Sequence, residues 1–320
     1  MHPKVSVIIP TWNRRDLVVG CLRALAKQTF TAFEAIVADD GSTDDTVAVL
    51  HRDFPKVHVE LLEHNRGFAA AVNAGIRKAT GEWVFLLNND VTLAPDCLDA
   101  LVAAADAAMA APLLLWRDDP GVIYSAGDRI RASGRPESIG FRAPLEEFHF
   151  PDRIFGVSAA AGLYRRSLFD DTGLLDERFI AYFEDSDLCF RARLAGFDAV
   201  FVPEAVATHI GSASIASKTW WRSAQCYRNH ALLVLKNMPL SLLFHYGPAI
   251  AAERLHQARR LFSSARTEFG AVQAGWLLLR TWASLMWAVP HALRERHRIQ
   301  NTRRMTPATL NALLTKGATP

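Results

Sequence analysis

Trp83-Val84-Phe85-Leu86-Leu87-Asn88-Asn89-Asp90 is a run of five apolar residues followed by three polar ones. The apolar part does not alternate with polar residues, which predicts a strand that is buried on both faces. Strands of this kind are typical of parallel sheets with helices on each side. The polar residues fall where this strand ends, so they are candidates for a functional site.

Segments on both sides of this run alternate between apolar stretches and helical periodicity. Strands are predicted at residues 5–10, 33–40, 57–62 and 199–202, and helices at residues 16–28, 42–54, 67–80, 95–108, 184–195 and 213–236. Ser42 or Thr43 is expected to cap the second helix, and Gly81 is expected to close the third. This order predicts an α/β fold with a mostly parallel, Rossmann-like central sheet that is flanked by helices.

Polar side chains follow four of these elements, in the loops at residues 11–14, 39–42, 65–67 and 88–90. In a sheet of this type, ligands bind beyond the carboxyl ends of the strands. Because four separate loops place polar groups at one edge, we expect the ligand site to lie there.

A second polar feature is the segment 182–191, YFEDSDLCFR, which places Glu184, Asp185 and Asp187 within four residues. An unpaired carboxylate is costly to bury, so this cluster requires a cation, a metal or a catalytic role. Asp187 is expected to pair with the arginine one turn later. His209 follows Asp185 by 24 residues. Two acidic sites and one histidine indicate metal-assisted group transfer with a separate carboxylate base.

Charge is unevenly distributed over the 320 residues, half of which are hydrophobic. From residue 240 onward there are eleven Lys/Arg and three Asp/Glu, which gives +8 and leaves −5 for the remainder of a chain whose total is +3. A basic, Trp-containing tail favours an anionic partner surface. A membrane is favoured over nucleic acid because long aliphatic runs, not stacking aromatics, separate the basic residues. No nucleic-acid partner is expected.

The tail contains two apolar stretches, at residues 238–252 and 269–293. The first is too short to span a bilayer, and the second carries Gln273, Arg280 and Ser284 on one helical stripe. We expect residues 237–320 to form an amphipathic, basic helical extension that lies on an anionic membrane, as a unit separate from a domain at residues 1–236. A spanning helix, or packing on that domain, is the alternative. Since residues 1–4 are too few for a signal peptide, the expected location is the cytoplasm, peripheral on the inner face of the cell membrane.

The chain resembles a family 2 glycosyltransferase with a GT-A fold, and within that family the bacterial rhamnosyltransferase-like and galactofuranosyltransferase-like members. The resemblance covers residues 3–235 and rests on these segments in order: Pro10-Thr11-Trp12-Asn13, Asp39-Asp40-Gly41-Ser42, Asn65-Arg66-Gly67, Asn88-Asn89-Asp90, Glu184-Asp185 and His209. Each segment alone is a weak signal, but their combination is specific.

The resemblance implies an inverting transfer from a nucleotide-diphosphate sugar, assisted by Mg²⁺ or Mn²⁺. Asp90 and His209 match the metal site, and Asp185 matches the general base, with Glu184 as the alternative. Asn88 stands where the family's DxD motif has its first acid. This departure predicts either a weaker metal affinity or a contact of Asn88 with the sugar or ribose.

The nucleotide sugar is expected to contact the strand-end loops. Asp39 and Asp40 match the family's base- and ribose-binding acids, because a carboxylate suits imide N–H and hydroxyl donors. Arg66 and Arg14 are candidates for phosphate or base, and Asn73 faces either the helix interior or the ribose. The full candidate set is Pro10, Thr11, Asn13, Arg14, Asp39, Asp40, Arg66, Gly67, Asn73, Asn88 and Asn89.

The expected reaction moves a sugar from dTDP-rhamnose or a UDP-hexose to a hydroxyl of a lipid-linked glycan, in polysaccharide or cell-wall assembly. A nucleotidyltransferase of similar fold is one alternative, but it would need a Gly-rich phosphate loop and a lysine near the first strand, where residues 11–14 stand. A non-catalytic, nucleotide-sugar-binding relative in a membrane complex is another, and Asn88 is its only support. A dehydrogenase or P-loop enzyme is disfavoured, since no G-x-G-x-x-G follows the first strand and no GKS or GKT occurs.

Overall fold

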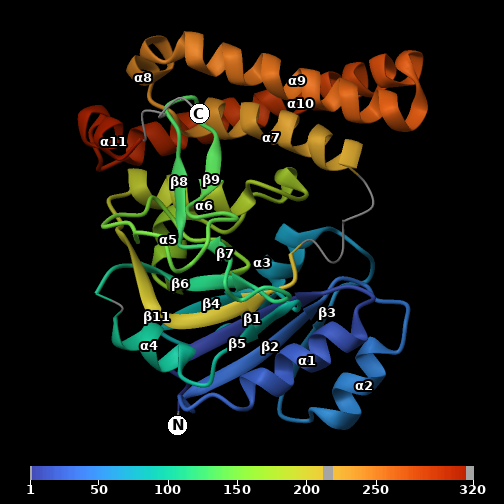
Figure 1. Ribbon diagram of the computed structural model, residues 1–320, viewed down its shortest axis with the longest axis vertical. Helices are drawn as coiled ribbons and strands as arrows, with labels where there is room; N and C mark the ends of the chain where they lie inside the picture. The colour runs from blue at the N-terminus through green and yellow to red at the C-terminus, as the bar shows by residue number, and fades with distance from the viewer. Residues whose placement is uncertain (1, 105, 212–218, 315–320) are drawn as a thin grey trace. The chain divides into compact units, whose positions relative to one another are not determined.

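The computed structural model describes residues 2–104, 106–211 and 219–314 (Figure 1). Contacts divide the chain into two compact units, which are described separately. Unit 1 comprises Met1–Asp128, Ser138–Glu177 and Phe197–Gly211; unit 2 comprises Arg129–Glu137, Arg178–Gly196 and Ser212–Pro320. The expected division at residue 236 separates a catalytic domain from a membrane-binding extension by function, not by contacts, and it stays a prediction.

Unit 1 is built on one central sheet with the strand order β3-β2-β1-β4-β10-β6-β11-β5, and β7 pairs with β6. The strands are β1 Val5–Thr11, β2 Phe33–Asp39, β3 His58–Leu61, β4 Trp83–Leu87, β5 Val91–Leu93, β6 Met109–Trp116, β7 Ile123–Ser125, β10 Ala161–Arg165 and β11 Ala199–His209. The β1–β2, β1–β4, β2–β3 and β6–β11 pairs are parallel, whereas β10 runs antiparallel to β4 and β6. The predicted α/β class with a mostly parallel sheet is confirmed.

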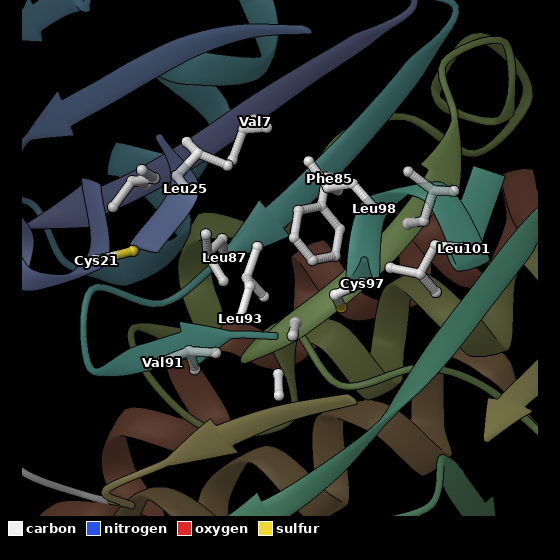
Figure 2. Packing of buried hydrophobic residues seen from close by; sticks show 14 of the residues in the cluster. Val7, Cys21, Leu25, Phe85, Leu87, Val91, Leu93, Cys97, Leu98 and Leu101 are labelled. Atoms are coloured by element: carbon white, nitrogen blue, oxygen red, sulfur yellow. The ribbon is translucent and has the colours of Figure 1, made fainter. Parts of the chain in front are cut away.

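The helices of unit 1 are α1 Arg15–Leu25, α2 Thr46–Asp53, α3 Phe68–Lys78, α4 Cys97–Ala103 and α5 Leu168–Thr172. Successive side chains of β1 point to opposite faces of the sheet. Val7 lies in one buried cluster with Leu25 of α1 and Leu98 of α4 (Figure 2). Ile8 faces α3, where its Cγ2 lies so close to Gly75 that a Cβ there would not fit. The sheet is therefore covered on both faces, as the apolar run of β4 indicates.

α1 ends at Leu25, three residues before its predicted end. Two further helix ends differ from the prediction because a tertiary contact replaces the expected cap. The helix predicted from residue 42 begins at Thr46, since Ser42 Oγ accepts from the Asn13 N–H instead of capping α2. The next helix ends at Lys78, with Ala79 in an extended conformation, and Gly81 is not its C-cap. The Gly81 N–H donates to Ser6 Oγ at 2.9 Å, and a Cβ on Gly81 would lie 2.7 Å from the Ser6 nitrogen.

Two other boundaries also differ. α4 is Cys97–Ala103, shorter than the helix predicted for residues 95–108, because β6 already begins at Met109. β11 extends seven residues past the predicted end at Val202, with a register shift between Val202 and Val206 that lets the strand continue along β6. This longer strand ends at His209.

Unit 2 is largely helical. Its helices are α6 Glu184–Leu194, α7 Thr219–Asn237, α8 Leu240–His245, α9 Gly247–Phe269, α10 Ala271–Thr302 and α11 Pro307–Leu313. The helix α7 was predicted at residues 213–236, and its first residues lie outside the described part of the chain. α7, α9 and α10 pack against one another, and Gly270, with a φ of 84°, joins α9 to α10 in a hairpin (Figure 1). The short strands β8 Asp128–Ile130 and β9 Pro136–Ser138 pair with each other, and a 3-10 turn covers Glu177–Phe179. Among the described helices, none is both long and apolar enough to cross a membrane.

Candidate active site

The carboxyl ends of β1 and β2 are joined by a network centred on Asn13. Asn13 has a φ of 51°, a conformation that asparagine tolerates better than most residues. Its N–H donates to Ser42 Oγ at 2.8 Å, and its Oδ1 accepts from the Thr43 N–H at 2.7 Å. Asp39 Oδ1 in turn accepts from the Ser42 N–H at 2.8 Å. These contacts fix the two loops against each other. They use only one carboxylate oxygen of Asp39, Oδ1, and leave the second, Oδ2, out of the network.

That second oxygen, Asp39 Oδ2, is buried and accepts no hydrogen bond from any residue that the structure describes. Asp40 differs, because each of its oxygens already accepts a backbone hydrogen bond, from Arg66 N–H at 2.7 Å and from Gly67 N–H at 2.8 Å. Burial raises the pKa of Asp40, and these two hydrogen bonds oppose the rise. Asp40 thus holds the loop before α3 in place, while Asp39 offers an acceptor to a ligand.

Arg66 and Asn73 both contact the loop around Glu177. Arg66 Nη2 forms an ion pair with Glu177 Oε2 at 2.8 Å on the surface of unit 1. Asn73 is 2% exposed; its Nδ2 donates to Leu175 O at 2.9 Å, and its Oδ1 accepts from the Leu175 N–H at 3.0 Å. Asn73, for which the helix interior and the ribose were the two expected positions, is thus buried against the loop at Leu175 and Glu177. Arg14 stands at the N-cap position of α1, beside the same sheet edge.

Asn88 and Asn89 follow β4, next to the end of β1. Asn89 Nδ2 donates to Thr11 Oγ1 at 3.0 Å, and Pro10 lies buried within β1, in register with Ala38 of β2. Asn88 Oδ1 is buried, and no donor in the described residues reaches it. The edge therefore carries two buried oxygens without donors, on Asp39 and Asn88, at the ends of two strands that flank β1. Buried polar atoms without partners are rare in folded proteins and indicate a missing ligand or water.

Asp90 and His209 meet at the same edge. His209 ends β11, and it is in register with Val91, the first residue of β5 and the neighbour of Asp90. His209 Nε2 and Asp90 Oδ1 lie 3.0 Å apart, and both side chains are buried. Tyr124 packs edge-on against the imidazole at a centroid distance of 4.3 Å. Tyr124 was not predicted, since nothing in the sequence around residue 124 connects it to His209.

The geometry of this pair fits a divalent cation. Two adjacent ligands of an octahedral ion with bonds of about 2.1 Å are separated by about 3.0 Å. Asp90 Oδ1 and His209 Nε2, which are hydrogen-bonded to each other in this structure, have the same separation, so both could ligate one ion with little movement. No group of three or more His, Cys, Asp or Glu side chains that could hold a metal exists within the described residues. Mg²⁺ sites commonly use one or two carboxylates, together with water and substrate phosphates, so Asp90 with His209 as a second ligand would suffice.

In unit 2 the three acids of the 184–187 cluster have different environments. Asp187 is fully buried and neutralised, because its carboxylate accepts from Arg191 Nε at 2.9 Å, Lys236 Nζ at 3.0 Å and Asn237 Nδ2 at 2.8 Å. The predicted pair with Arg191 is confirmed. Glu184 is 7% exposed, and burial together with its two acidic neighbours raises its pKa to about 8. Asp185 is half-buried, and its Oδ1 accepts from the Ser186 N–H at 2.6 Å.

The loop before α6 is held by Asn229 of α7, a residue that sequence reasoning missed. Ile180, Tyr182 and Phe183 in this loop have positive φ angles of 66°, 68° and 72°. Such conformations cost of order 1–3 kcal/mol each in residues other than glycine. Asn229 is fully buried, and its Nδ2 donates to three carbonyl oxygens of the loop at 2.8–2.9 Å. It thereby fixes the strained backbone that presents Glu184 and Asp185.

An α/β sheet with acid and amide side chains at its carboxyl edge, and a carboxylate–imidazole pair beside them, is the architecture of a GT-A glycosyltransferase. Residues 6–173 match the family model described as Glycosyl transferase family 2, and the chain belongs to this family. It is therefore a glycosyltransferase, and the expected family and fold are confirmed.

Two relatives by sequence illustrate the family. The chain is 30% identical over 237 residues to the N-acetylglucosaminyl-diphospho-decaprenol L-rhamnosyltransferase of Mycobacterium tuberculosis, which covers 65% of this chain and 76% of that one. It is 29% identical over 246 residues to the O-antigen biosynthesis protein RfbC of Myxococcus xanthus, and here the match covers 71% of this chain and only 19% of the larger relative.

Two solved structures share the fold. The mannosyltransferase PcManGT of Pyrobaculum calidifontis, solved in complex with GDP-Man and Mn²⁺, has a TM-score of 0.56 at 20% identity, over 94% of this chain and 86% of that one. TarS of S. aureus has a TM-score of 0.55 at 19% identity, over 91% of this chain and 55% of that one. At these identities the likeness shows the fold.

Proposed function

We propose that this protein is an inverting, metal-dependent glycosyltransferase that moves a sugar from dTDP-rhamnose or a UDP-hexose to a hydroxyl of a lipid-linked glycan. The observation that carries the proposal is the buried Asp90–His209 pair, with its 3.0 Å separation, at the sheet edge where Asp39 and Asn88 have oxygens without donors. A bound Mg²⁺ or Mn²⁺ would be held by Asp90 and His209, and would stabilise the negative charge that develops on the diphosphate leaving group.

On the donor side, Asp39 is the proposed acceptor for the nucleobase imide or the ribose hydroxyls. Its Oδ2 is buried and without a donor, whereas both oxygens of Asp40 already accept backbone hydrogen bonds. Asn88, which replaces the first acid of the DxD motif, offers a neutral buried oxygen that suits a sugar or ribose hydroxyl. We therefore assign Asn88 to donor binding and not to the metal.

On the acceptor side, Asp185 is the proposed general base. The attacking hydroxyl must lose its proton as it attacks the anomeric carbon, and a carboxylate takes that proton only while it is ionised. The raised pKa of Glu184, about 8, keeps that side chain protonated at neutral pH. Asp187 is bound by three donors inside unit 2. Of the three acids, Asp185 is the one whose environment suits a base.

The lipid-linked acceptor is supported by the decaprenol-linked acceptor in the name of the mycobacterial relative, and the membrane contact is supported by the surface of α10. The α10 apolar stripe, which comprises Val272, Trp276, Leu279, Met286, Trp287 and Leu293, lies on one face of the helix and is exposed. Between residues 255 and 294 there are five arginines and a single acid, Glu268. Exposed tryptophans beside basic residues suit an anionic membrane surface. A second copy of this chain docked on the same stripe would bring two positively charged faces together, so a membrane is the favoured partner.

The thermal unfolding midpoint tests the proposed donor site. Purified protein is heated with UDP, dTDP or GDP, each with Mn²⁺ or with a chelator, and the variants His209→Gln and Asp185→Asn are compared with wild type. A ligand at a hundred times its dissociation constant adds about 2.7 kcal/mol to the free energy of unfolding. We expect one nucleotide to raise the midpoint in a metal-dependent way in wild type and Asp185→Asn, and the metal dependence to disappear in His209→Gln.

The same variants separate the alternatives in a transfer assay with that nucleotide's sugar. Asp185→Asn should bind the donor and lose transfer by at least about a hundredfold. A wild-type protein that binds a nucleotide but neither transfers nor hydrolyses its sugar would support the non-catalytic relative instead. A shift that ignores Mn²⁺ would refute the metal role of Asp90 and His209.

A further inference from the structure

A cavity of about 450 Å³ opens in unit 2 where the last turns of α10 meet the start of α8. This volume lies within the range of small-molecule pockets. Its polar wall comes from α10 and the residue that ends it: Arg296, His297, Gln300, Asn301 and Arg303. None of these residues belongs to the proposed transfer site.

Two guanidinium nitrogens at this cavity are buried without an acceptor. Arg296 Nη1 donates to the carbonyl oxygens of Leu235 and Met238, at 2.8 Å each. Its Nη2 is buried, and no acceptor reaches it from the described part of the chain. The same is true of Arg303 Nη1. A buried donor without an acceptor costs about 1–3 kcal/mol, and more when the group is charged, so both atoms indicate a missing anionic partner.

Among the described residues, the lining of the cavity carries positive charge and contains no Asp or Glu. Burial lowers the pKa of Arg296, and no neighbouring acid opposes this effect. Asn301 Nδ2 donates to His297 Nε2 at 3.0 Å, so a neutral His297 carries its proton on Nδ1 and is itself a donor. The wall of the cavity thus brings two guanidinium groups, of which Arg296 is held by backbone carbonyl oxygens, and the Nδ1–H of a neutral His297 close together.

We propose that this cavity binds a phosphate or diphosphate group through Arg296 and Arg303. The planar fork of a guanidinium pairs with two phosphate oxygens at once, which distinguishes phosphate from halide or a single hydroxyl. Leu240 and Leu293 complete the wall and suit the carbon skeleton to which the phosphate is attached. Leu293 also ends the α10 apolar stripe, so the phosphate can come from a lipid headgroup or from a soluble phosphate ester.

The experiment titrates inorganic pyrophosphate into the full chain by calorimetry, with a chelator present so that no metal-linked binding contributes. Wild type is compared with Arg303→Gln and with Arg294→Gln, a matched control that removes the same charge from the exposed face of α10 without touching the cavity. Asp90→Asn is included because it alters the proposed metal site and leaves the cavity intact. A second arm measures sedimentation with phosphatidylcholine vesicles that carry either phosphatidic acid or phosphatidylglycerol.

We expect pyrophosphate to bind wild type, Arg294→Gln and Asp90→Asn alike, and to bind Arg303→Gln about tenfold to a hundredfold more weakly. A preference of wild type for phosphatidic acid that Arg303→Gln loses identifies a lipid headgroup as the source; pyrophosphate binding without that preference identifies a soluble ester. Equal affinity of Arg303→Gln and wild type, or no binding of either probe, overturns the proposal. Because Asp90→Asn binds normally in the expected case, failure of the transfer mechanism does not affect this outcome.

Discussion

The protonated state of Glu184 makes the stability of this protein depend on pH in a defined direction. Glu184 has an ordinary pKa of 4.5, which burial beside Asp185 and Asp187 raises to about 8 in the folded state. Between these values the folded chain binds one proton more than the unfolded chain. The free energy of unfolding therefore falls as pH rises, by about 1.4 kcal/mol per pH unit for this group. The stabilisation is complete below pH 4.5 and is lost as pH rises through about 8.

Glu184→Gln isolates this effect, because the amide has the shape of the protonated acid and does not titrate. The shift of about 3.5 units, from 4.5 to about 8, corresponds to roughly 5 kcal/mol over the whole window. Relative to wild type, the variant should gain about 1.4 kcal/mol per unit as pH rises through this window. With a urea dependence of about 1–3 kcal/mol per molar, the difference between the two unfolding midpoints should grow by roughly 0.5 to 1.4 M per pH unit.

The assay is urea unfolding of both proteins, followed by circular dichroism at several pH values between the two pKa values of Glu184. Glu268→Gln, which removes an exposed acid from α9 of the same unit, is the control and should follow wild type throughout. A difference between Glu184→Gln and wild type that stays constant with pH would refute the reasoning, because an ionised Glu184 would then be as stable in the fold as in water. In that case Glu184 would again compete with Asp185 as the base.

Three further perturbations test other parts of the structure. His209→Gln removes one of the two proposed metal ligands and should weaken Mn²⁺ binding at least about tenfold in a paramagnetic-resonance titration, whereas unchanged affinity would contradict the assignment. Asn229→Leu removes the side-chain N–H donors that bind three carbonyl oxygens of the loop before α6, and also the oxygen that accepts from Arg228 Nη1 of α7. The free energy of unfolding in urea should fall by about 3 kcal/mol; a loss below about 1 kcal/mol would show that the loop keeps its conformation without Asn229. Trp276→Ser combined with Trp287→Ser should reduce sedimentation with anionic vesicles more than tenfold, while Trp12→Ser, an exposed tryptophan of unit 1, should not; equal effects would refute the α10 apolar stripe as the membrane face.

Five strands of the sheet, β1, β2, β3, β4 and the first part of β11, were predictable from local sequence, whereas β5, β6, β7 and β10 were not predicted. β1 and β4 are buried throughout and mostly apolar, and such strands can be recognised without knowing their neighbours in the sheet. Helix ends were less predictable, since Ser42 is a favourable cap by residue type and the structure uses it elsewhere. The Ser42 hydroxyl accepts a hydrogen bond from the Asn13 N–H, which lies 29 residues earlier in the sequence. That contact exists only after β1 and β2 pair.

The contact between Asp90 and His209 could not be predicted from the local sequence of either residue. Asp90 was expected just after a strand, and His209 was joined to it by the resemblance to the family, but their contact depends on the bulge that lets β11 run on to residue 209 beside β5. A strand that stopped at Val202, as predicted, would leave His209 in a loop. The sequence therefore indicates the two residues, and the register of β11 brings them together.

The cluster of Glu184, Asp185 and Asp187 shows what a sequence leaves open even where it points to the right segment. Three acids within one helical turn look equivalent, and each is a plausible base by residue type. Their environments differ because Lys236 and Asn237, some fifty positions later on α7, neutralise Asp187, while burial keeps a proton on Glu184.

Since residues of α7 distinguish the acids from one another, the substitution Lys236→Met should do more than destabilise unit 2. With that cation absent, less positive charge would lie beside the Asp187 carboxylate, and the pKa of Glu184 would change through the repulsion between the two acids. A shifted pH dependence of unfolding in Lys236→Met, which Glu184→Gln abolishes, is the expected sign of this coupling; a pH dependence equal to that of wild type would refute it.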